Sequence, residues 1–185
     1  MLSMAGGKGG VGRTTCALAF GAALGRDGRE ALVVGTDARG PDLRRTAGID
    51  ARPDTADSTG LWAVADGVAA TVAARSVPGR PGLSILPRDC GPGRRPERRA
   101  LDRLDWPGPV VLDAPAALRS AARSAAICGA LGTPTVGTIL TRCSESFDLE
   151  PLLDCPTIAA VPPTDRPLAD GAVAATFDRL VARIG

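Results

Sequence analysis

Short runs of apolar residues alternate with segments of helical periodicity along most of the chain. The apolar runs predict strands at residues 1–5, 30–35, 82–87, 109–113, 135–141 and 157–161. Helices are predicted at residues 14–26, 61–74, 116–131 and 168–184, and a further arginine-rich helix begins at residue 96. Alternation of this kind is typical of an α/β domain, in which a mainly parallel sheet is flanked by helices on both faces.

Residues 39–60 interrupt this alternation. They are rich in proline, glycine and aspartate and predict a long irregular loop, which is a frequent place for function. No internal repeat or linker divides the rest, and 185 residues are close to the size of one ordinary domain. We therefore predict a single domain that spans residues 1–185.

The composition argues against several kinds of chemistry. The chain has no histidine and no tyrosine, and aromatic residues make up 3% of it. These absences remove histidine bases and most zinc or haem sites, and they argue against base-stacking platforms for single strands. The cysteines lie far apart without a CxxC pair, which predicts buried cytosolic thiols and neither disulfides nor cluster ligands. They are Cys16, Cys90, Cys128, Cys143 and Cys155.

Charge is nearly balanced over the whole chain but is concentrated in one segment. The formal net charge is +2, which does not by itself indicate a nucleic-acid partner. If residues from 96 onward are helical, Arg99 and Arg103 share one stripe, and Arg95 leads into it. This stripe fits contact with phosphate, an acidic partner or anionic lipid. The simpler interpretation is a solvated helix face that carries its own Glu97 and Asp102.

The first residues and the apolar runs bear on the cellular compartment. Residues 1–5 run directly into glycines, without the basic and apolar regions of a secretory signal, and no apolar run is long enough to cross a bilayer. We therefore expect a cytoplasmic protein.

The strongest motif is the glycine-rich run GGKGGVGRTT at residues 6–15, between the first predicted strand and the first predicted helix. Glycines let successive backbone N–H groups turn inward, so that they form an anion-binding nest at a helix N-terminus. Against the pattern GxxxxGK[ST], the match runs from Gly7 to Gly12, with Arg13 in place of the lysine and then Thr14, whose hydroxyl suits Mg²⁺. The chain's one lysine, Lys8, also lies in this run, whereas every other basic residue is arginine.

The same run resembles the deviant Walker A sequence KGGVGKTT of the ParA/MinD family of ATPases. That family follows its second strand with D-x-D, of which this chain keeps Asp37 and has Gly35 in place of the first aspartate. Residues 110–115 (VVLDAP) resemble the family's Walker B strand and the start of switch II. Residues 139–142 and 160–165 resemble segments near the adenine base. The resemblance implies a P-loop NTPase fold with ATP and Mg²⁺ as cofactors.

Roles for individual residues follow from the resemblance. Thr14 and Asp113 would serve Mg²⁺, and Asp37 would position the attacking water. Lys8 would reach across a nucleotide-dependent homodimer to the phosphates of the partner. The residues implied in nucleotide binding are Gly7, Gly9, Gly10, Val11, Gly12, Arg13, Thr14, Thr15, Arg142 and Pro163. Taken alone, Asp37 and Asp113 would be read as helix caps or loop residues; beside the phosphate loop they indicate function.

Three departures from the family pattern bear on activity. Arg13 keeps the charge of the usual lysine, but its planar fork is larger than a compact ammonium. Between Asp113 and residue 135 only one helical segment fits, so one strand–helix unit of the family is predicted to be missing. Thr141 stands where the family commonly has an asparagine near the adenine.

The resemblance implies an ATP-binding switch that dimerises on nucleotide, hydrolyses ATP slowly or poorly, and positions cell components through an activator or cargo protein. The alternative is a non-catalytic scaffold or interaction module on a degenerate P-loop fold. The working surface would be non-specific DNA, through the arginine run, or a membrane, through residues 174–185, which would place the protein peripherally at the nucleoid or the membrane. In these last residues Phe177, Leu180, Val181 and Ile184 share one face, a pattern that also describes a closing helix packed on the sheet.

Overall fold

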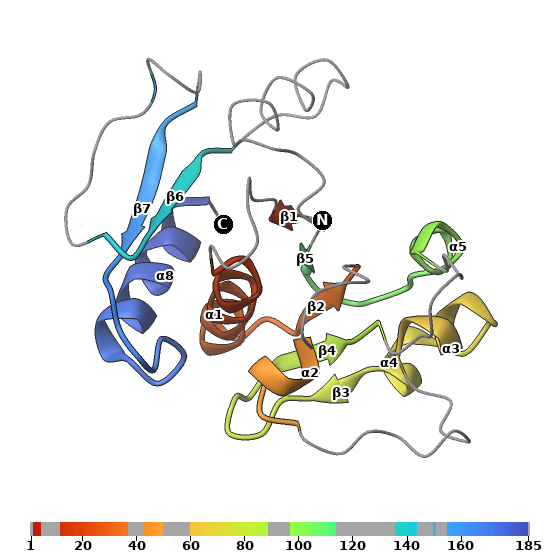
Figure 1. Cartoon of the computed structure of the whole chain (residues 1–185). Coiled ribbons are helices and arrows are strands. Elements are labelled where there is room, and N and C mark those ends of the chain that lie inside the picture. Colours follow the sequence, from red (N-terminus) through yellow and green to blue (C-terminus); the bar gives the residue numbers. More distant parts are fainter. Residues whose placement is uncertain are drawn as a thin grey trace.

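The structure is a computed structural model of the whole chain, shown in Figure 1. It describes residues 2–4, 12–36, 43–49, 60–88, 97–113, 136–143, 150 and 155–184.

A five-stranded sheet with the order β1-β5-β2-β4-β3 forms the centre of the described structure. β1 (Leu2–Met4), β5 (Val110–Asp113), β2 (Ala31–Gly35) and β4 (Leu83–Leu86) run parallel, and β3 (Arg75–Ser76) pairs antiparallel with β4. All five residues of β2 are buried, as the apolar run at 30–35 predicts for a central strand. The predicted α/β fold with a mainly parallel sheet is therefore confirmed.

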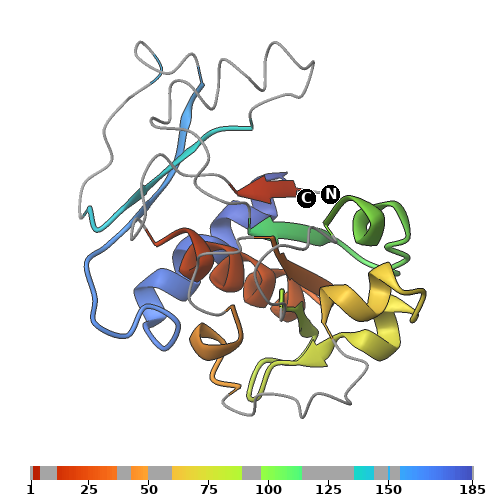
Figure 2. The same cartoon turned by 45° about the vertical axis from the view of Figure 1, so that its right-hand side comes forward.

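Helices cover both faces of this sheet. Alternate residues of β2 point in opposite directions and therefore enter two separate apolar cores. Ala31 and Val33 join the core beneath α1 (Arg13–Arg26) and α8 (Gly171–Ile184), which lie side by side in Figures 1 and 2. Leu32 and Val34 join a second core, beneath α3 (Leu61–Ala65), α4 (Ala70–Ala73) and α5 (Glu97–Asp102). The sheet is thus held between two apolar layers.

α8 closes the fold. Phe177, Leu180 and Val181 are buried against the core that α8 shares with α1, whereas Ile184 is 40% exposed. The interpretation of this segment as a closing helix is confirmed, since its apolar face is already covered by the protein. No described helix is both long enough and apolar enough to span a membrane.

Asp170 caps the start of α8, because its Oδ1 accepts hydrogen bonds from the N–H groups of Ala172 (2.8 Å) and Val173 (3.2 Å). The hydrogen bond from the Val173 amide, followed by one from the Thr164 side chain, lowers the pKa of Asp170 below its usual value. The cap is therefore strongest when this carboxyl is ionised.

A second, two-stranded sheet lies beside α8. β6 (Thr138–Thr141) and β7 (Thr157–Val161) run parallel, with a register shift between Thr138 and Ile139. Among the described strands, β6 and β7 make no ladder with β1, so the larger sheet ends at β1. The predicted loss of a strand–helix unit concerns residues 114–135, which lie outside the described residues, as does the predicted helix 116–131.

Two sequence predictions differ from the structure, and one strand was not predicted. The single helix predicted at 61–74 is two short helices, because Gly67 adopts φ 102° between them. The predicted irregular loop at 39–60 contains a short helix, α2 (Leu43–Thr46), whose Leu43 is buried under α1. The edge strand β3 has only two residues and was not predicted, because so short a segment carries no periodicity.

The arginine stripe at α5 divides into two kinds of residue. Arg99 is exposed, in agreement with a solvated helix face. Arg103 instead donates from Nη1 to the carbonyl oxygen of Ala65 at 2.6 Å, at the C-terminal end of α3. A cation at this end of a helix is favourable, so Arg103 has a structural role in joining α5 to α3. Arg95 lies outside the described residues.

Candidate functional site

The carboxyl ends of β1, β5 and β2 meet at one edge of the sheet. Asp113, the last residue of β5, is paired in register with Met4 of β1 and Gly35 of β2. In open α/β sheets this edge is where ligands bind. Thr36 fixes the position of Asp113, because both its backbone N–H and its hydroxyl donate to the Asp113 carbonyl oxygen at 3.1 Å.

The N-terminus of α1 faces the same edge. Gly12 precedes the helix in the left-handed conformation, with φ 79°, and its carbonyl oxygen accepts the first helical hydrogen bond from the Cys16 amide at 2.8 Å. A glycine meets this positive φ without strain, and the free N–H groups of the first turn favour an anion. A Cβ at Gly12 would lie 3.8 Å from Cγ2 of Thr141, which places the end of β6 beside the glycine.

Thr14 and Asp113 are joined directly, although they lie 99 residues apart in the sequence. The Thr14 hydroxyl donates to Oδ2 of Asp113 at 2.6 Å. Asp113 is 3% exposed, so this carboxylate is held in a position with little access to water. The motif at the start of α1 and the acidic residue at the end of β5 therefore form one site.

Arg13 forms the second contact to the same carboxylate. Its Nε lies 3.4 Å from Oδ1 of Asp113, and the two side chains are 12% and 5% exposed. Arginine stands here where the P-loop pattern has a lysine for the phosphates. In the described structure its Nε faces Asp113.

The negative charge of Asp113 also reaches the second turn of α1. Burial, and to a lesser extent this charge, raises the pKa of the Cys16 thiol from 9.0 to about 11. Cys16 is therefore a neutral thiol near neutral pH and acts as a small core residue, in line with the sequence prediction. Cys155 is also buried, Cys143 is half-buried, and Cys90 and Cys128 lie outside the described residues.

The donor set formed by Thr14 and Asp113 fits Mg²⁺. A hydroxyl and a carboxylate are hard oxygen ligands, and Mg²⁺ in phosphate sites commonly takes one or two such groups together with phosphate oxygens and water. Their distance of 2.6 Å puts both oxygens within reach of one small ion. Within the described residues no cluster of three or more His, Cys, Asp or Glu side chains offers another metal site.

The other residues implied by the family resemblance are placed as follows. Thr15 is half-buried in the first turn of α1, next to Thr14. Arg142 follows β6 with φ 57° and is exposed, and Pro163 is exposed after β7. Lys8, Asp37 and four residues of the glycine-rich run lie outside the described residues. These four are Gly7, Gly9, Gly10 and Val11.

Sequence reasoning missed two features of this site. Thr36, whose two hydrogen bonds hold Asp113, directly follows β2, where a hydroxyl near the sheet edge could have been noticed. The ion pair of Arg13 with Asp113 had no signal in the sequence, because the motif assigns this position to phosphate.

A parallel sheet between two helical layers, with a glycine turn and a Thr–Asp pair at its carboxyl edge, defines a P-loop NTPase fold. The family model of the anion-transporting ATPases, a P-loop family of the ParA/MinD type, matches residues 2–41. This match includes the glycine-rich run and supports the resemblance to the ParA/MinD family. No curated protein sequence matches the chain significantly.

Solved structures of three kinds of protein share the fold. The septum site-determining protein MinD of Pyrococcus horikoshii, in complex with Mg-ADP, is 19% identical, with a TM-score of 0.72 over 99% of this chain and 94% of that one. Cobyrinic acid a,c-diamide synthase of Mycobacterium smegmatis, with ADP and magnesium, is 20% identical, with a TM-score of 0.69 over 99% and 94%. A plasmid partition protein of Borrelia burgdorferi is 13% identical, with a TM-score of 0.63 over 99% and 96%. These likenesses establish the fold of MinD-like P-loop proteins.

Proposed function

We propose that the protein is an ATP-binding switch of the MinD/ParA type. The hydrogen bond between Thr14 and Asp113 carries this proposal, because it joins the glycine-rich helix start to the acidic strand end in one site. Bound Mg²⁺ would neutralise phosphate charge at this edge. Positioning and charge neutralisation supply most of the catalysis in phosphoryl transfer, so no histidine or other covalent catalyst is required.

The residues of the candidate site have separate roles in this proposal. The backbone amides of Gly9–Thr15 bind the phosphates, and Thr14 and Asp113 hold the metal ion. Lys8 completes the site of a second copy in a nucleotide-dependent homodimer, and Asp37 orients the attacking water. The dimer acts on an activator or cargo protein in cell division or in chromosome or plasmid partition, in the cytoplasm or at the surface of the nucleoid or membrane.

The Arg13–Asp113 ion pair favours a second candidate, in which the fold serves as a scaffold with weak or no nucleotide binding. Nε of Arg13 faces Asp113, so the approach of Arg13 to a phosphate, or of Mg²⁺ to Asp113, changes this ion pair. Nucleotide and metal therefore alter an existing contact between two largely buried side chains. We infer that ATP hydrolysis is slow or impaired for this reason.

Binding of a fluorescent ATP analogue, with and without Mg²⁺, separates the two candidates, and light scattering follows dimerisation. The proteins are the wild type, Arg13→Lys and Lys8→Ala, with Arg26→Lys as the matched control at the far end of α1. Micromolar binding by the wild type, with dimerisation lost in Lys8→Ala, supports the switch. Absence of wild-type binding at millimolar nucleotide refutes it, and binding regained only in Arg13→Lys identifies the scaffold.

A further inference from the structure

The opposite end of the sheet contains an open cavity of about 480 Å³. It lies at the amino ends of β2, β4 and β5, whereas Asp113 lies at the carboxyl ends of the same strands. The side chains that define its chemistry are Glu30, Ser76, Arg80, Ser84 and Trp106. None of these residues belongs to the candidate nucleotide site.

Trp106 forms a fixed wall of this cavity. Its indole Nε1 donates to the carbonyl oxygen of Glu30 at 2.9 Å, and the ring packs against the core beneath α3–α5. The chain after Trp106 approaches the same carbonyl closely, since a Cβ on Gly108 would lie 1.9 Å from the Glu30 oxygen. These contacts hold the aromatic ring at the cavity without a ligand.

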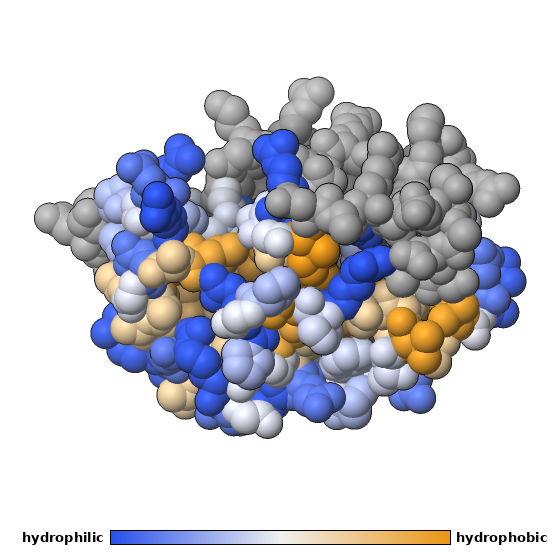
Figure 3. Space-filling model, turned by 90° about the horizontal axis from the view of Figure 1, so that it is seen from below, coloured by the Kyte–Doolittle hydropathy of each residue, from blue (hydrophilic) through white to orange (hydrophobic). Residues whose placement is uncertain are grey.

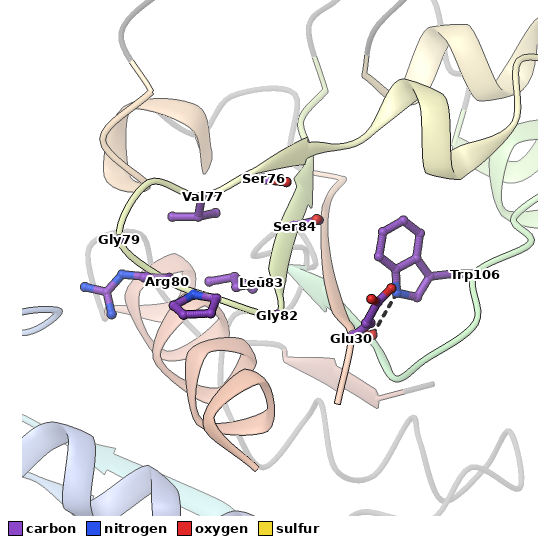
Figure 4. A pocket seen from close by; sticks show the side chains of 10 residues that line it. Glu30, Ser76, Val77, Gly79, Arg80, Gly82, Leu83, Ser84 and Trp106 are labelled. Atoms are coloured by element: carbon purple, nitrogen blue, oxygen red, sulfur yellow. Dashed lines mark hydrogen bonds between the residues drawn. The ribbon is translucent and has the colours of Figure 1, made fainter. Parts of the chain in front are cut away.

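Glu30 is the charged group at this wall. Its side chain is exposed, runs alongside the indole in Figure 4, and makes no ion pair within the described part of the chain. Arg80 also lines the cavity, but it points away from Glu30 and donates from Nη2 to the carbonyl oxygen of Leu168. The guanidinium therefore leaves the charge of Glu30 uncompensated.

Two hydroxyls face the same space. Ser76 of β3 and Ser84 of β4 are paired in register, and in Figure 4 both oxygens lie on the side of the strands that faces Trp106. A carboxylate, an aromatic ring and two hydroxyls form a site for a cation that donates several hydrogen bonds. Figure 3 shows the molecule from below, with separate apolar patches among hydrophilic residues on the coloured part of this face.

We propose that this cavity binds an arginine side chain of a partner polypeptide. A guanidinium is planar, stacks on an indole and donates a fork of hydrogen bonds to a carboxylate, which a lysine ammonium cannot do. The cavity exceeds the volume of one arginine side chain, so it also admits the flanking peptide. Because it lies at the other end of the strands, the arginine and a nucleotide occupy the protein without overlap. The proposal does not depend on nucleotide binding.

Titration with the blocked peptide acetyl-Gly-Arg-Gly-amide, followed by the indole N–H resonance of Trp106 in NMR spectra, tests the proposal. Trp106→Phe assigns that resonance against the one of Trp62. The expected dissociation constant is on the order of 1 mM, as for a single side chain in a preformed site. The same peptide with citrulline, which has nearly the same shape but no charge, is expected to bind at least about fivefold more weakly.

The protein variants separate the cavity from general electrostatics. Glu30→Gln is expected to weaken the arginine peptide about fivefold, whereas Asp105→Asn, next to Trp106 but not in the cavity, leaves it unchanged. Equal urea midpoints of wild type and Glu30→Gln exclude unfolding as the cause. Equal shifts by the citrulline peptide, or unchanged binding in Glu30→Gln, overturn the proposal. If the Trp106 indole resonance shifts with protein concentration in the absence of peptide, a second copy of the chain occupies the cavity. This result would overturn the proposal of a partner polypeptide.

Discussion

The ion pair between Arg13 and Asp113 is the contact that most directly decides how the candidate site works, and a double-mutant cycle measures it. The cycle compares Arg13→Gln, Asp113→Asn and the double variant with the wild type, without nucleotide or metal. Asparagine keeps one oxygen that accepts the hydrogen bond of Thr14, so the coupling energy reports mainly on the arginine.

The magnitude follows from distance and burial. At 3.4 Å and an effective dielectric constant of about 20, the attraction is roughly 5 kcal/mol before desolvation. Desolvation of both groups offsets much of this, so we expect a coupling energy of about 1–3 kcal/mol. Asp113→Asn alone is expected to lower the free energy of unfolding by about 1–3 kcal/mol, because it removes the charge that faces Arg13 and keeps an oxygen for the Thr14 hydroxyl.

An exposed ion pair between the end of α1 and α8 provides the control. Arg26 and Asp178 approach to 2.7 Å, closer than Arg13 and Asp113, but their side chains are 41% and 47% exposed. Solvent screening reduces such a pair to about 0.2–1 kcal/mol. Urea unfolding followed by far-UV circular dichroism at pH 7 gives both coupling energies. The reasoning is refuted if Arg13 and Asp113 couple by less than about 0.3 kcal/mol, the usual error of additivity, or if the exposed pair couples more strongly.

Three further predictions concern the fold. Phe177→Ala, at a residue with 0% exposure, is expected to lower the free energy of unfolding by about 3–5 kcal/mol. Ile184→Ala, at 40% exposure, is expected to change it by less than about 0.5 kcal/mol. Similar losses for both variants in urea unfolding would contradict the burial of this helix face. The pKa of Asp170 is lowered in the folded protein, so the ionised carboxyl stabilises the fold fully above the usual value of 3.8, and this stabilisation is lost as pH falls through the folded pKa. Asp170→Asn is therefore expected to reduce the loss of stability in acid. The same dependence of the free energy of unfolding on pH in both proteins would contradict this. Gly108→Ala puts a Cβ 1.9 Å from the Glu30 carbonyl oxygen, which also accepts the hydrogen bond of the Trp106 indole. The variant is therefore expected to lower the midpoint temperature of unfolding and to shift the indole N–H resonance of Trp106. An unchanged NMR spectrum would refute the close approach.

The central strands could be predicted because their environment is uniform. β2 and β5 are apolar on both faces since helices cover both faces, so a continuous apolar run is sufficient evidence. The helix at 61–74 was predicted as one helix, although Gly67 is a local stop signal: with its positive φ it ends α3 in a turn in which the Val68 N–H donates to the Ala63 carbonyl oxygen and the Gly67 N–H to that of Val64. Nearby, Arg103 contacts the end of α3, which the sequence does not reveal.

The candidate site divides in a similar way. Thr14 and Asp113 could be paired from the sequence, because the motif and the end of a parallel strand each point to the same sheet edge. The contact between Arg13 and Asp113 could not be predicted, since the motif assigns the position of Arg13 to phosphate and the sequence does not show that its Nε lies beside Asp113.

The fold does not determine which of the two candidate functions holds. A septum site-determining protein, a cobyrinic acid a,c-diamide synthase and a plasmid partition protein share it at 13–20% identity with this chain. Function therefore has to be argued from the site. The family resemblance implies that Lys8, Thr14, Asp37 and Asp113 serve a nucleotide switch, whereas Arg13 departs from the family pattern. Because a guanidinium can contact a carboxylate or a phosphate, we expect the affinity for ATP to depend on how readily Arg13 turns from Asp113 to the nucleotide. If Mg²⁺ takes over Asp113 and releases Arg13 to the phosphates, metal and nucleotide each favour the binding of the other; if it does not, the same ion pair keeps the fold as a scaffold.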